Sequence, residues 1–174
     1  MSNFKTKLHK IKAFAFDVDG VFTDGTVIAT GTGDLLRSHN AKDGFALRSA
    51  ILMGYKVAII TGGTSQSIVK RFAPIGVEDI ILGAKNKIGY FNNFLEKYNL
   101  KPEEVLFMGD DIPDIETLRN AGISTCPSDA VNEVKEVCEY ISIFPGGKGC
   151  VRDVIEQVMK IQGKWALAAE AFSG

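Results

Sequence analysis

One stretch near the N-terminus, residues 11–20, constrains the fold of this chain more than any other. An apolar run of strand length is followed at once by Asp-Val-Asp-Gly, which begins at Asp17. In an open α/β sheet, ligands bind just beyond the carboxyl ends of the parallel strands, so such a strand delivers acid groups to the place where chemistry occurs. Residues two apart in extended backbone point the same way, and Asp17 and Asp19 can therefore share one site.

Two carboxylates in one site repel each other unless a cation joins them. At ~4 Å the repulsion is about 1 kcal/mol in bulk water and about 4 kcal/mol at an effective dielectric of 20. Mg²⁺ would remove it, because hard cations take oxygen ligands. A turn after the strand is the alternative, since Asp and Gly form turns. An EF-hand loop is excluded, because the positions that need Gly and Glu hold Phe22 and Ile28.

Composition limits the class of protein. The chain has 174 residues, 45% hydrophobic and 24% charged, which predicts one globular domain over residues 1–174. The net charge of −1 gives no basis for binding nucleic acid or an anionic membrane. No apolar run approaches the ~20 residues that span a bilayer. Residues 1–12 are polar and basic without an apolar signal core, so we expect a cytoplasmic protein.

The cysteines and histidines predict no chemistry of their own. Cys126, Cys138 and Cys150 are odd in number and not closely paired, which argues against a disulfide framework or a structural zinc site. We expect reduced thiols, buried or half-buried. His9 and His39 are far apart, and neither stands in a triad-like or metal-ligand pattern.

Apolar segments of strand length alternate with helical segments along the rest of the chain. Asp43 is expected to cap a helix that begins at Gly44. The alternation predicts an α/β fold with a doubly wound, mainly parallel, Rossmann-like sheet and helices on both faces. The expected strands are 12–16, 57–60, 79–82, 105–108, 123–126 and 140–143, and the expected helices are 44–53, 65–73, 86–98, one ending near 120, and 151–161.

Residues 24–38 interrupt this alternation. Short apolar segments flank a glycine-rich stretch, a pattern that predicts a protruding β-hairpin. An isolated hairpin is marginal in water, so its apolar residues should lie on the protein's own body or on another subunit. The glycines are no dinucleotide fingerprint, because the third glycine position holds Leu36. We assign no role to the alanine-containing tail, residues 163–174.

Three of the predicted strands end in polar clusters. These ends converge at the switch point of the sheet if the strands are neighbours. Amides at a helix start favour an anion such as phosphate, and capping explains at most one of three carboxylates after the fourth strand, so the group favours a metal. The clusters are Asp17 and Asp19, Thr61 and Gly62, and Asp110, Asp111 and Asp114.

Lys87 completes the predicted pocket. It stands in the first turn of a predicted helix, where the helix dipole disfavours a cation. The position is more sensible if the amine faces a phosphate, whereas a solvated surface lysine is the alternative. The residues together predict an acid-rich pocket with one hydroxyl, backbone amides and one lysine.

In this order, the clusters resemble the haloacid dehalogenase superfamily of phosphohydrolases. The resemblance covers about residues 13–152. In that family the first aspartate attacks phosphorus and forms an aspartyl-phosphate, which divides one hard step into two. The resemblance therefore implies that Asp17 is the nucleophile, and that Asp19 protonates the leaving alkoxide and then activates water.

The same resemblance implies a Mg²⁺ site and a phosphoryl site. The metal ligands would be the carboxylates of Asp17 and Asp110 and the backbone carbonyl of Asp19, with Asp111 and Asp114 behind them. The remaining groups would hold the phosphoryl oxygens and stabilise the spreading negative charge. They are the Thr61 hydroxyl, the Gly62 amide and the Lys87 ammonium.

Further segments resemble one family within the superfamily, the phosphatases of 3-deoxy-D-manno-octulosonate 8-phosphate. The resemblance implies a compact enzyme of lipopolysaccharide sugar synthesis without a cap domain, usually a tetramer, whose hairpins assemble subunits that help close each other's sites. Asn40 and Arg71 are candidates for the sugar-acid end, Arg71 because guanidinium pairs well with carboxylate; an exposed helix arginine is the alternative. The segments are residues 17–25, the hairpin, 39–44 and 146–152.

Three positions depart from that family's pattern. Gly63 stands where a basic residue is common, Lys42 where arginine is common, and Cys150 where alanine is common. The catalytic residues are untouched, but the choice of sugar stays open. A nine-carbon keto-deoxy sugar acid 9-phosphate is the alternative substrate.

Two non-enzymatic classes compete with a phosphatase. One is a phospho-switch similar to a response-regulator receiver, whose phosphorylated Asp ends a middle strand; here the third strand runs into Leu82, Gly83 and Ala84, with no aspartate. The other is a catalytically silent scaffold that uses the hairpin, which the intact acids disfavour. A general acid at Asp19, two residues after the nucleophile, suits turnover.

Overall fold

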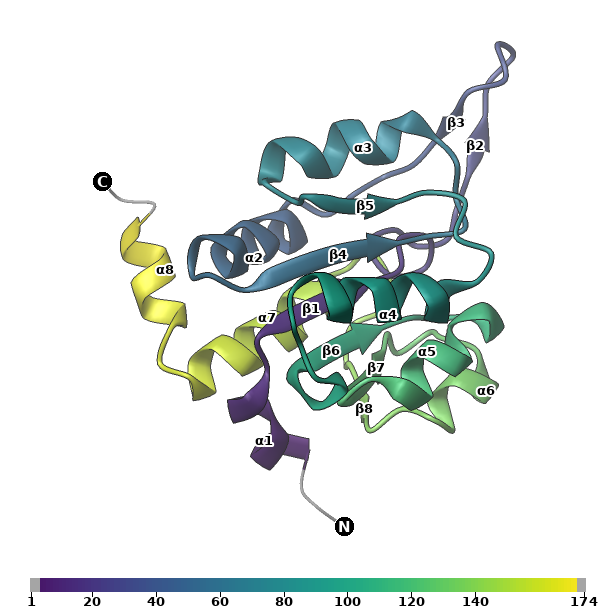
Figure 1. Ribbon diagram of the computed structural model, residues 1–174. Helices are drawn as coiled ribbons and strands as arrows, with labels where there is room; N and C mark the ends of the chain where they lie inside the picture. Colours follow the sequence, from purple (N-terminus) through teal and green to yellow (C-terminus); the bar gives the residue numbers. More distant parts are fainter. Residues whose placement is uncertain (1–3, 172–174) are drawn as a thin grey trace.

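A six-stranded parallel sheet runs through the centre of the molecule in a computed structural model that describes residues 4–171 (Figure 1). The strand order is β5-β4-β1-β6-β7-β8, and every neighbouring pair is parallel. The prediction of a doubly wound parallel sheet is confirmed. The strands are β1 (Ala13–Phe16), β4 (Lys56–Ile60), β5 (Asp79–Ile81), β6 (Val105–Met108), β7 (Ile123–Cys126) and β8 (Tyr140–Ile141).

Helices cover both faces of the sheet (Figure 1). On one face lie α2 (Ala41–Leu52), α3 (Gln66–Phe72), α7 (Cys150–Ile161) and α8 (Trp165–Ala171). On the other lie α4 (Lys87–Lys97), α5 (Ile115–Asn120) and α6 (Asn132–Lys135). A short helix, α1 (Phe4–Lys7), precedes β1.

Strand β1 shows how the sheet separates two apolar cores. Phe14 and Phe16 belong to the core under α2 and α7, whereas Ala13 and Ala15 belong to the core under α4 and α5. Successive side chains of a strand point to opposite faces, and a strand covered on both faces is apolar throughout. This explains why the strand reads as an unbroken apolar run that ends at the first aspartate.

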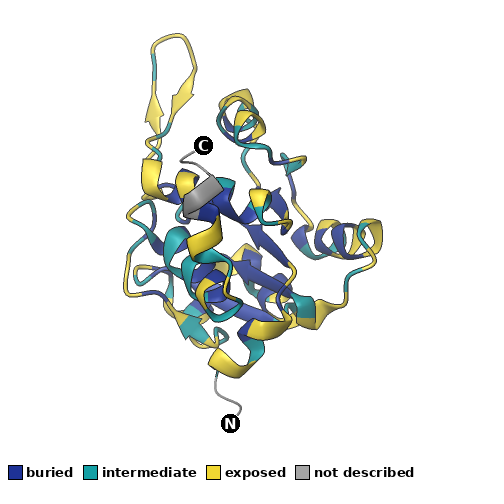
Figure 2. Ribbon diagram, turned by 90° about the vertical axis from the view of Figure 1, so that its left-hand side faces the viewer, coloured by how far each residue is buried: buried dark blue, intermediate teal, exposed yellow. Residues whose placement is uncertain are grey.

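The predicted hairpin is present and projects away from the sheet (Figure 2). Its antiparallel strands are β2 (Ile28–Ala29) and β3 (Leu35–Leu36). Ile28 and Leu36, both apolar, are 60% and 53% exposed. Contact of this apolar surface with another subunit stays a prediction.

The start of α2 corrects the expected cap. Asn40, not Asp43, is the N-cap: its backbone is extended and its Oδ1 accepts from the Lys42 amide at 2.8 Å. Asp43 lies buried inside the first turn, where its carboxylate accepts from the amide of Arg152 at 2.8 Å. Both residues are good caps, and packing against α7 decides between them.

Other boundaries moved by a few residues. Ser65 and Asn86 cap α3 and α4 instead of belonging to them, and β8 ends at Ile141 instead of residue 143. Helices α1 and α6 were not expected. Each has four residues, too short for a helical pattern in the sequence.

The cysteines are free thiols, as expected, with Cys126 and Cys150 buried and Cys138 half-buried. Among residues 4–171, the structure has no helix both long and apolar enough to cross a bilayer. The predicted tail, residues 163–174, contains α8, and residues 172–174 lie outside the described part of the chain.

Candidate active site

Three neighbouring strands deliver the polar clusters to one end of the sheet. Asp17 follows β1, Thr61 follows β4, and Asp110 lies two residues beyond β6. The Asp17 amide donates to the carbonyl of Met108 at 3.0 Å, which continues the pairing of β1 with β6 into the site. The predicted convergence is therefore confirmed. The hollow is about 550 Å³ and is lined by Asp17, Asp19, Gly20, Gly25, Thr61, Gly62, Gly63, Ala84, Lys85, Lys87, Asp110, Asp111, Pro113 and Asp114.

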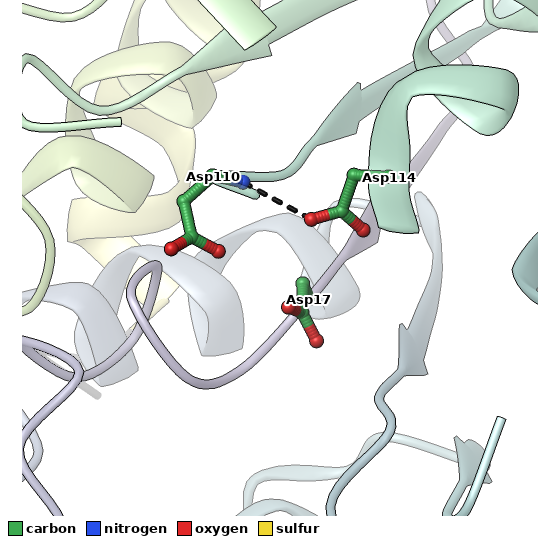
Figure 3. Close-up of side chains that lie close together, drawn as sticks. All are labelled: Asp17, Asp110 and Asp114. Carbon is green, nitrogen blue, oxygen red and sulfur yellow. Dashed lines mark hydrogen bonds between the residues drawn. The ribbon is translucent and has the colours of Figure 1, made fainter. Parts of the chain in front are cut away.

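Three carboxylates meet in this hollow (Figure 3). One oxygen each from Asp17, Asp110 and Asp114 lies within 4.8 Å of the others. Asp114, fully buried, also accepts from the amides of Asp110 and Asp111 at 3.1 and 3.4 Å, which fixes the turn that presents Asp110. Asp114 is thus a member of the carboxylate cluster, whereas the sequence resemblance placed it behind the metal ligands.

The electrostatics of the cluster call for a cation. Burial and the Asp114 carboxylate raise the pKa of Asp17 to about 6, against the opposing effect of Lys87. Burial, followed by Asp17 and Asp114, raises the pKa of Asp110 to about 8. The Oδ1 atoms of Asp17 and Asp110 are buried without a hydrogen-bond partner among the described residues. Crowded carboxylate oxygens with free lone pairs are the donor set that Mg²⁺ prefers.

Lys87 is the cation that the chain itself supplies. It is the first residue of α4, and its side chain is only 5% exposed. Its ammonium lies 3.0 Å from Asp17 Oδ2 and donates to Asp114 Oδ1 at 2.7 Å. Burial alone would lower the pKa of Lys87, but the two carboxylates raise it overall. The surface-lysine interpretation is therefore wrong, and the amine faces the predicted nucleophile.

Gly20 explains why the motif after β1 ends in glycine. Its φ is +83°, and a Cβ built there would lie 1.9 Å from Asp110 Oδ2. Only glycine gives this backbone its left-handed conformation without strain while leaving the space that Asp110 occupies.

Thr61 and Gly62 form the side of the hollow that follows β4. Thr61 is buried, and its hydroxyl accepts from the Gly63 amide at 3.1 Å. Its carbonyl accepts from the Ala84 amide, which ties this loop to the one before α4. A side chain at Gly62 would meet open space, so the backbone here borders the hollow directly.

Asp19 is in the hollow but outside the carboxylate cluster. Arg37, which follows β3 of the hairpin, donates to both carboxylate oxygens of Asp19. Its Nε lies 2.6 Å from Oδ1 and its Nη2 lies 3.0 Å from Oδ2. Arg37 was not among the sequence candidates. No motif marks it, because its contact depends on the path that the chain takes as it leaves the hairpin. Whether the Asp19 carbonyl binds metal stays a prediction.

Asn40 and Arg71 lie at the side of the site, outside the hollow's lining. Both polar ends of Asn40 are engaged, by the α2 amide and, at 3.4 Å, by the carbonyl of Gly147. Arg71 reaches across to α2, where a Cβ at Gly44 would lie 2.4 Å from its Nη2. Their contact with substrate stays a prediction.

No chemistry was expected at His39 from the sequence, but the structure gives this residue charged neighbours. Burial lowers its pKa, Arg71 and Arg37 lower it further, and Asp19 opposes them. Its Nδ1 and the Arg71 Nε are both buried without a hydrogen-bond partner in the described chain. His39 therefore lies in a basic group beside Asp19.

Asp111 has a local role in the structure. Its exposed carboxylate accepts from the Ile112 amide at 2.8 Å and caps the turn that carries Asp114. It lines the hollow without joining the carboxylate cluster. A supporting part in metal binding stays a prediction.

A larger hollow, about 620 Å³, lies at the opposite end of β1, where Ile11 and Lys12 lead into the strand. Its acids and lysines include an ion pair between Lys12 and Glu104. Size does not decide the site here. The convergent carboxylates and the buried lysine are at the carboxyl end of the sheet.

Comparison with known proteins gives the family. Residues 38–122 match the family described as haloacid dehalogenase-like hydrolase. The 3-deoxy-D-manno-octulosonate 8-phosphate phosphatase KdsC of Salmonella typhi is 34% identical over 159 residues, which are 91% of this chain and 85% of that protein. The chain belongs to the haloacid dehalogenase-like hydrolases. It is an enzyme of the phosphoric monoester hydrolase class.

Solved structures agree with this family. The 3-deoxy-D-manno-octulosonate 8-phosphate phosphatase of Moraxella catarrhalis, in complex with magnesium ion, phosphate ion and KDO, has a TM-score of 0.94 and 30% identity, and the match covers 99% of both chains. The cobalt-bound deoxy-D-mannose-octulosonate 8-phosphate phosphatase of Haemophilus influenzae has a TM-score of 0.87 at 28% identity, with 91% of this chain and 92% of that one covered.

Proposed function

We propose that this enzyme hydrolyses 3-deoxy-D-manno-octulosonate 8-phosphate to the free sugar acid and phosphate, with Mg²⁺ as cofactor and an aspartyl-phosphate on Asp17. The observation that carries the proposal is the pairing of Asp17 with Lys87 beside Asp110 and Asp114. A relative that binds magnesium, phosphate and KDO supports the choice of substrate. When bound, Mg²⁺ supplies positive charge to the phosphoryl oxygens; Asp17 and Asp110 would hold it.

In the first half of the reaction, an Asp17 carboxylate oxygen attacks phosphorus. The P–O bond to the sugar breaks as the new bond forms, and Asp19 gives a proton to the leaving alkoxide. Lys87, 3.0 Å from Asp17, stabilises the negative charge that spreads over the transferring group, together with the Thr61 hydroxyl and the Gly62 amide.

In the second half, the Asp19 carboxylate takes a proton from water. The resulting hydroxide attacks phosphorus, the bond to Asp17 breaks, and inorganic phosphate leaves. Asp19 ends protonated and Asp17 ends as a carboxylate, ready for the next cycle. Arg71 would pair with the sugar carboxylate, because guanidinium binds carboxylate well, and Asn40 would assist at the same end.

We further propose that the chain acts as a single capless domain in a homotetramer assembled through the hairpin. The exposed side chains of Ile28 and Leu36 are the apolar surface that a neighbouring copy would cover. A neighbour placed there would help close the hollow, since the hairpin leads into Arg37 and the site.

The test is phosphate release from a panel of sugar phosphates, with Mg²⁺ and with chelator. The panel contains the eight-carbon acid 8-phosphate, a nine-carbon keto-deoxy acid 9-phosphate and simple hexose phosphates. We expect strong, metal-dependent preference for the eight-carbon acid and loss of release in Asp17→Asn. Full activity of Asp17→Asn would contradict the mechanism.

Preference for the nine-carbon acid would keep the mechanism and change the substrate. Gly63 is the observation behind this alternative: a Cβ there would lie 3.5 Å from Asp19 Oδ2, so a side chain would enter the hollow. Its absence leaves room beside Asp19. Turnover of no panel member would favour a phospho-switch or scaffold.

A further inference from the structure

We propose that Arg37 is a positioning residue for the general acid and base: it holds the Asp19 carboxylate in the orientation that proton transfer to the leaving group requires. The inference rests on the proposed function, because it assigns Arg37 a part in the step that Asp19 performs. It concerns a residue of the hairpin segment, residues 24–38, outside the three polar clusters and Lys87.

The contact between the two side chains is bidentate. The two distances, 2.6 and 3.0 Å, join two neighbouring guanidinium nitrogens to the two oxygens of one carboxylate. A planar fork of this kind fixes both the position and the plane of the carboxylate, which a single hydrogen bond does not. Each oxygen keeps a further lone pair for substrate or water.

Arg37 is held from its other side as well. Its Nη1 donates to the carbonyl of Leu35 in β3 at 3.3 Å. The Arg37 side chain is 5% exposed, whereas the Asp19 side chain is 32% exposed and borders the hollow. The well-covered partner is therefore the arginine, and the partner open to the substrate is the aspartate. This arrangement suits an arginine that holds the carboxylate of a residue in contact with substrate.

Other groups around Asp19 do not replace Arg37 in holding its carboxylate. The residue after Thr61 and Gly62 is Gly63, which has no side chain to reach Asp19. Lys87 is occupied by Asp17 and Asp114. Among the described residues, Arg37 is the ion-pair partner of Asp19. Its removal would let the carboxylate rotate about its side-chain bonds.

The leaving group distinguishes this role from a general structural one. A sugar alkoxide is a poor leaving group and needs the proton from Asp19, whereas p-nitrophenolate leaves without one. Loss of orientation at Asp19 should therefore slow phosphoryl transfer from the sugar phosphate and spare the transfer from p-nitrophenyl phosphate. A misfolded or loosened site would slow both.

The experiment measures the first turnover by rapid mixing of the Mg²⁺-loaded enzyme with each substrate. The sugar substrate is the preferred member of the panel. The variants are Arg37→Met, Arg37→Lys and Arg37→Ala, the controls Arg48→Met and Arg48→Ala, and Asp19→Asn alone and combined with Arg37→Met. Arg48 is the matched control, because its guanidinium also bonds a carbonyl, that of Ile75 at 2.9 Å, away from the hollow. Thermal unfolding of each variant is recorded in parallel.

We expect Arg37→Met to slow phosphoryl transfer from the sugar phosphate by about 10- to 100-fold. The rate of the p-nitrophenol burst should fall by less than about threefold. Lysine restores charge without the fork, so Arg37→Lys should recover only part of the loss. Millimolar guanidinium should speed the slowed Arg37→Ala variant and leave the rate of the control variant Arg48→Ala unchanged. In an Asp19→Asn background, Arg37→Met should add no further selective loss, because both changes remove one function.

Three results for Arg37→Met would each overturn the positioning role. They are equal slowing of both reactions, no slowing of either, and a higher KM with unchanged kcat. Failure of the proposed function looks different. An unmodified Asp17 during turnover, with an active Asp17→Asn variant, would remove the aspartyl-phosphate mechanism, and with it the role of Asp19 that Arg37 serves. If the wild-type enzyme shows a normal burst but Arg37→Met slows both substrates equally, only the proposal for Arg37 is refuted.

Discussion

Replacing Asp110 by asparagine should stabilise the metal-free enzyme at neutral and higher pH. The ordinary pKa of this side chain is 3.8, and burial with the neighbouring Asp17 and Asp114 raises it to about 8. Between these values the unfolded chain gives up the proton and the folded chain keeps it. The contribution of protonated Asp110 to the stability of the folded state is therefore complete below about pH 4 and is lost as pH rises toward 8. Asparagine has the same shape and cannot ionise, so it avoids the loss.

The magnitude follows from the size of this change. At 1.36 kcal/mol per pKa unit, the full effect is at most ~6 kcal/mol. Asp110 is only half-buried, and solvent screening reduces this to ~2–3 kcal/mol at pH 8. For a chain of 174 residues, that corresponds to a melting temperature about 4–12 °C higher in Asp110→Asn than in the wild type.

Thermal unfolding in chelator from pH 4 to pH 8 measures the difference, and the same series in Mg²⁺ tests its cause. The metal stabilises the folded state that binds it, so Mg²⁺ should raise the wild-type melting temperature far more than that of Asp110→Asn and reverse their order. Asp111→Asn is the control, since asparagine keeps the acceptor for the Ile112 amide. Equal stability of wild type and Asp110→Asn in chelator at pH 8 would refute the reasoning.

Two further changes test other parts of the structure. Lys87→Met should abolish phosphate release and lower the free energy of unfolding at pH 8 by about 3–5 kcal/mol in chelator, because it leaves two buried carboxylates without their partner; retained release or unchanged denaturant unfolding would contradict this. Ile28→Asp combined with Leu36→Asp should dissociate the proposed oligomer, because charges on an apolar interface oppose its burial. A fully active wild-type monomer in sedimentation would refute assembly through the hairpin.

The sheet could be predicted because its strands are short apolar runs with clear ends. Strand β1 is covered on both faces, so every side chain is apolar until the chain leaves the sheet at Asp17. The start of α2 could not be read in the same way. Asn40 and Asp43 are both good caps, and the amide of Arg152, more than a hundred residues away, takes one of them. Short helices such as α6 carry too few residues for a periodic signal.

The candidate site divides along the same line. The residues that follow strands could be found, because a parallel sheet brings its carboxyl ends together whatever the details of packing. Arg37 could not, because it reaches Asp19 only through the course of the hairpin. The partners of Lys87 also depend on tertiary structure: the sequence predicted an amine facing phosphate, and the structure adds that the same amine pairs with Asp17 and Asp114.

The charges around the proposed nucleophile, Asp17, connect these observations. With Asp17, Asp110 and Asp114 ionised, the cluster and the Lys87 ammonium carry a formal charge of −2, and a divalent cation would neutralise it. Without such a cation, the crowded carboxylates hold protons more tightly, in agreement with the raised pKa of Asp110. In the proposed mechanism, Asp17 must be ionised to attack phosphorus. We therefore expect metal binding and the ionisation of the proposed nucleophile to be one requirement, which Lys87 alone does not meet.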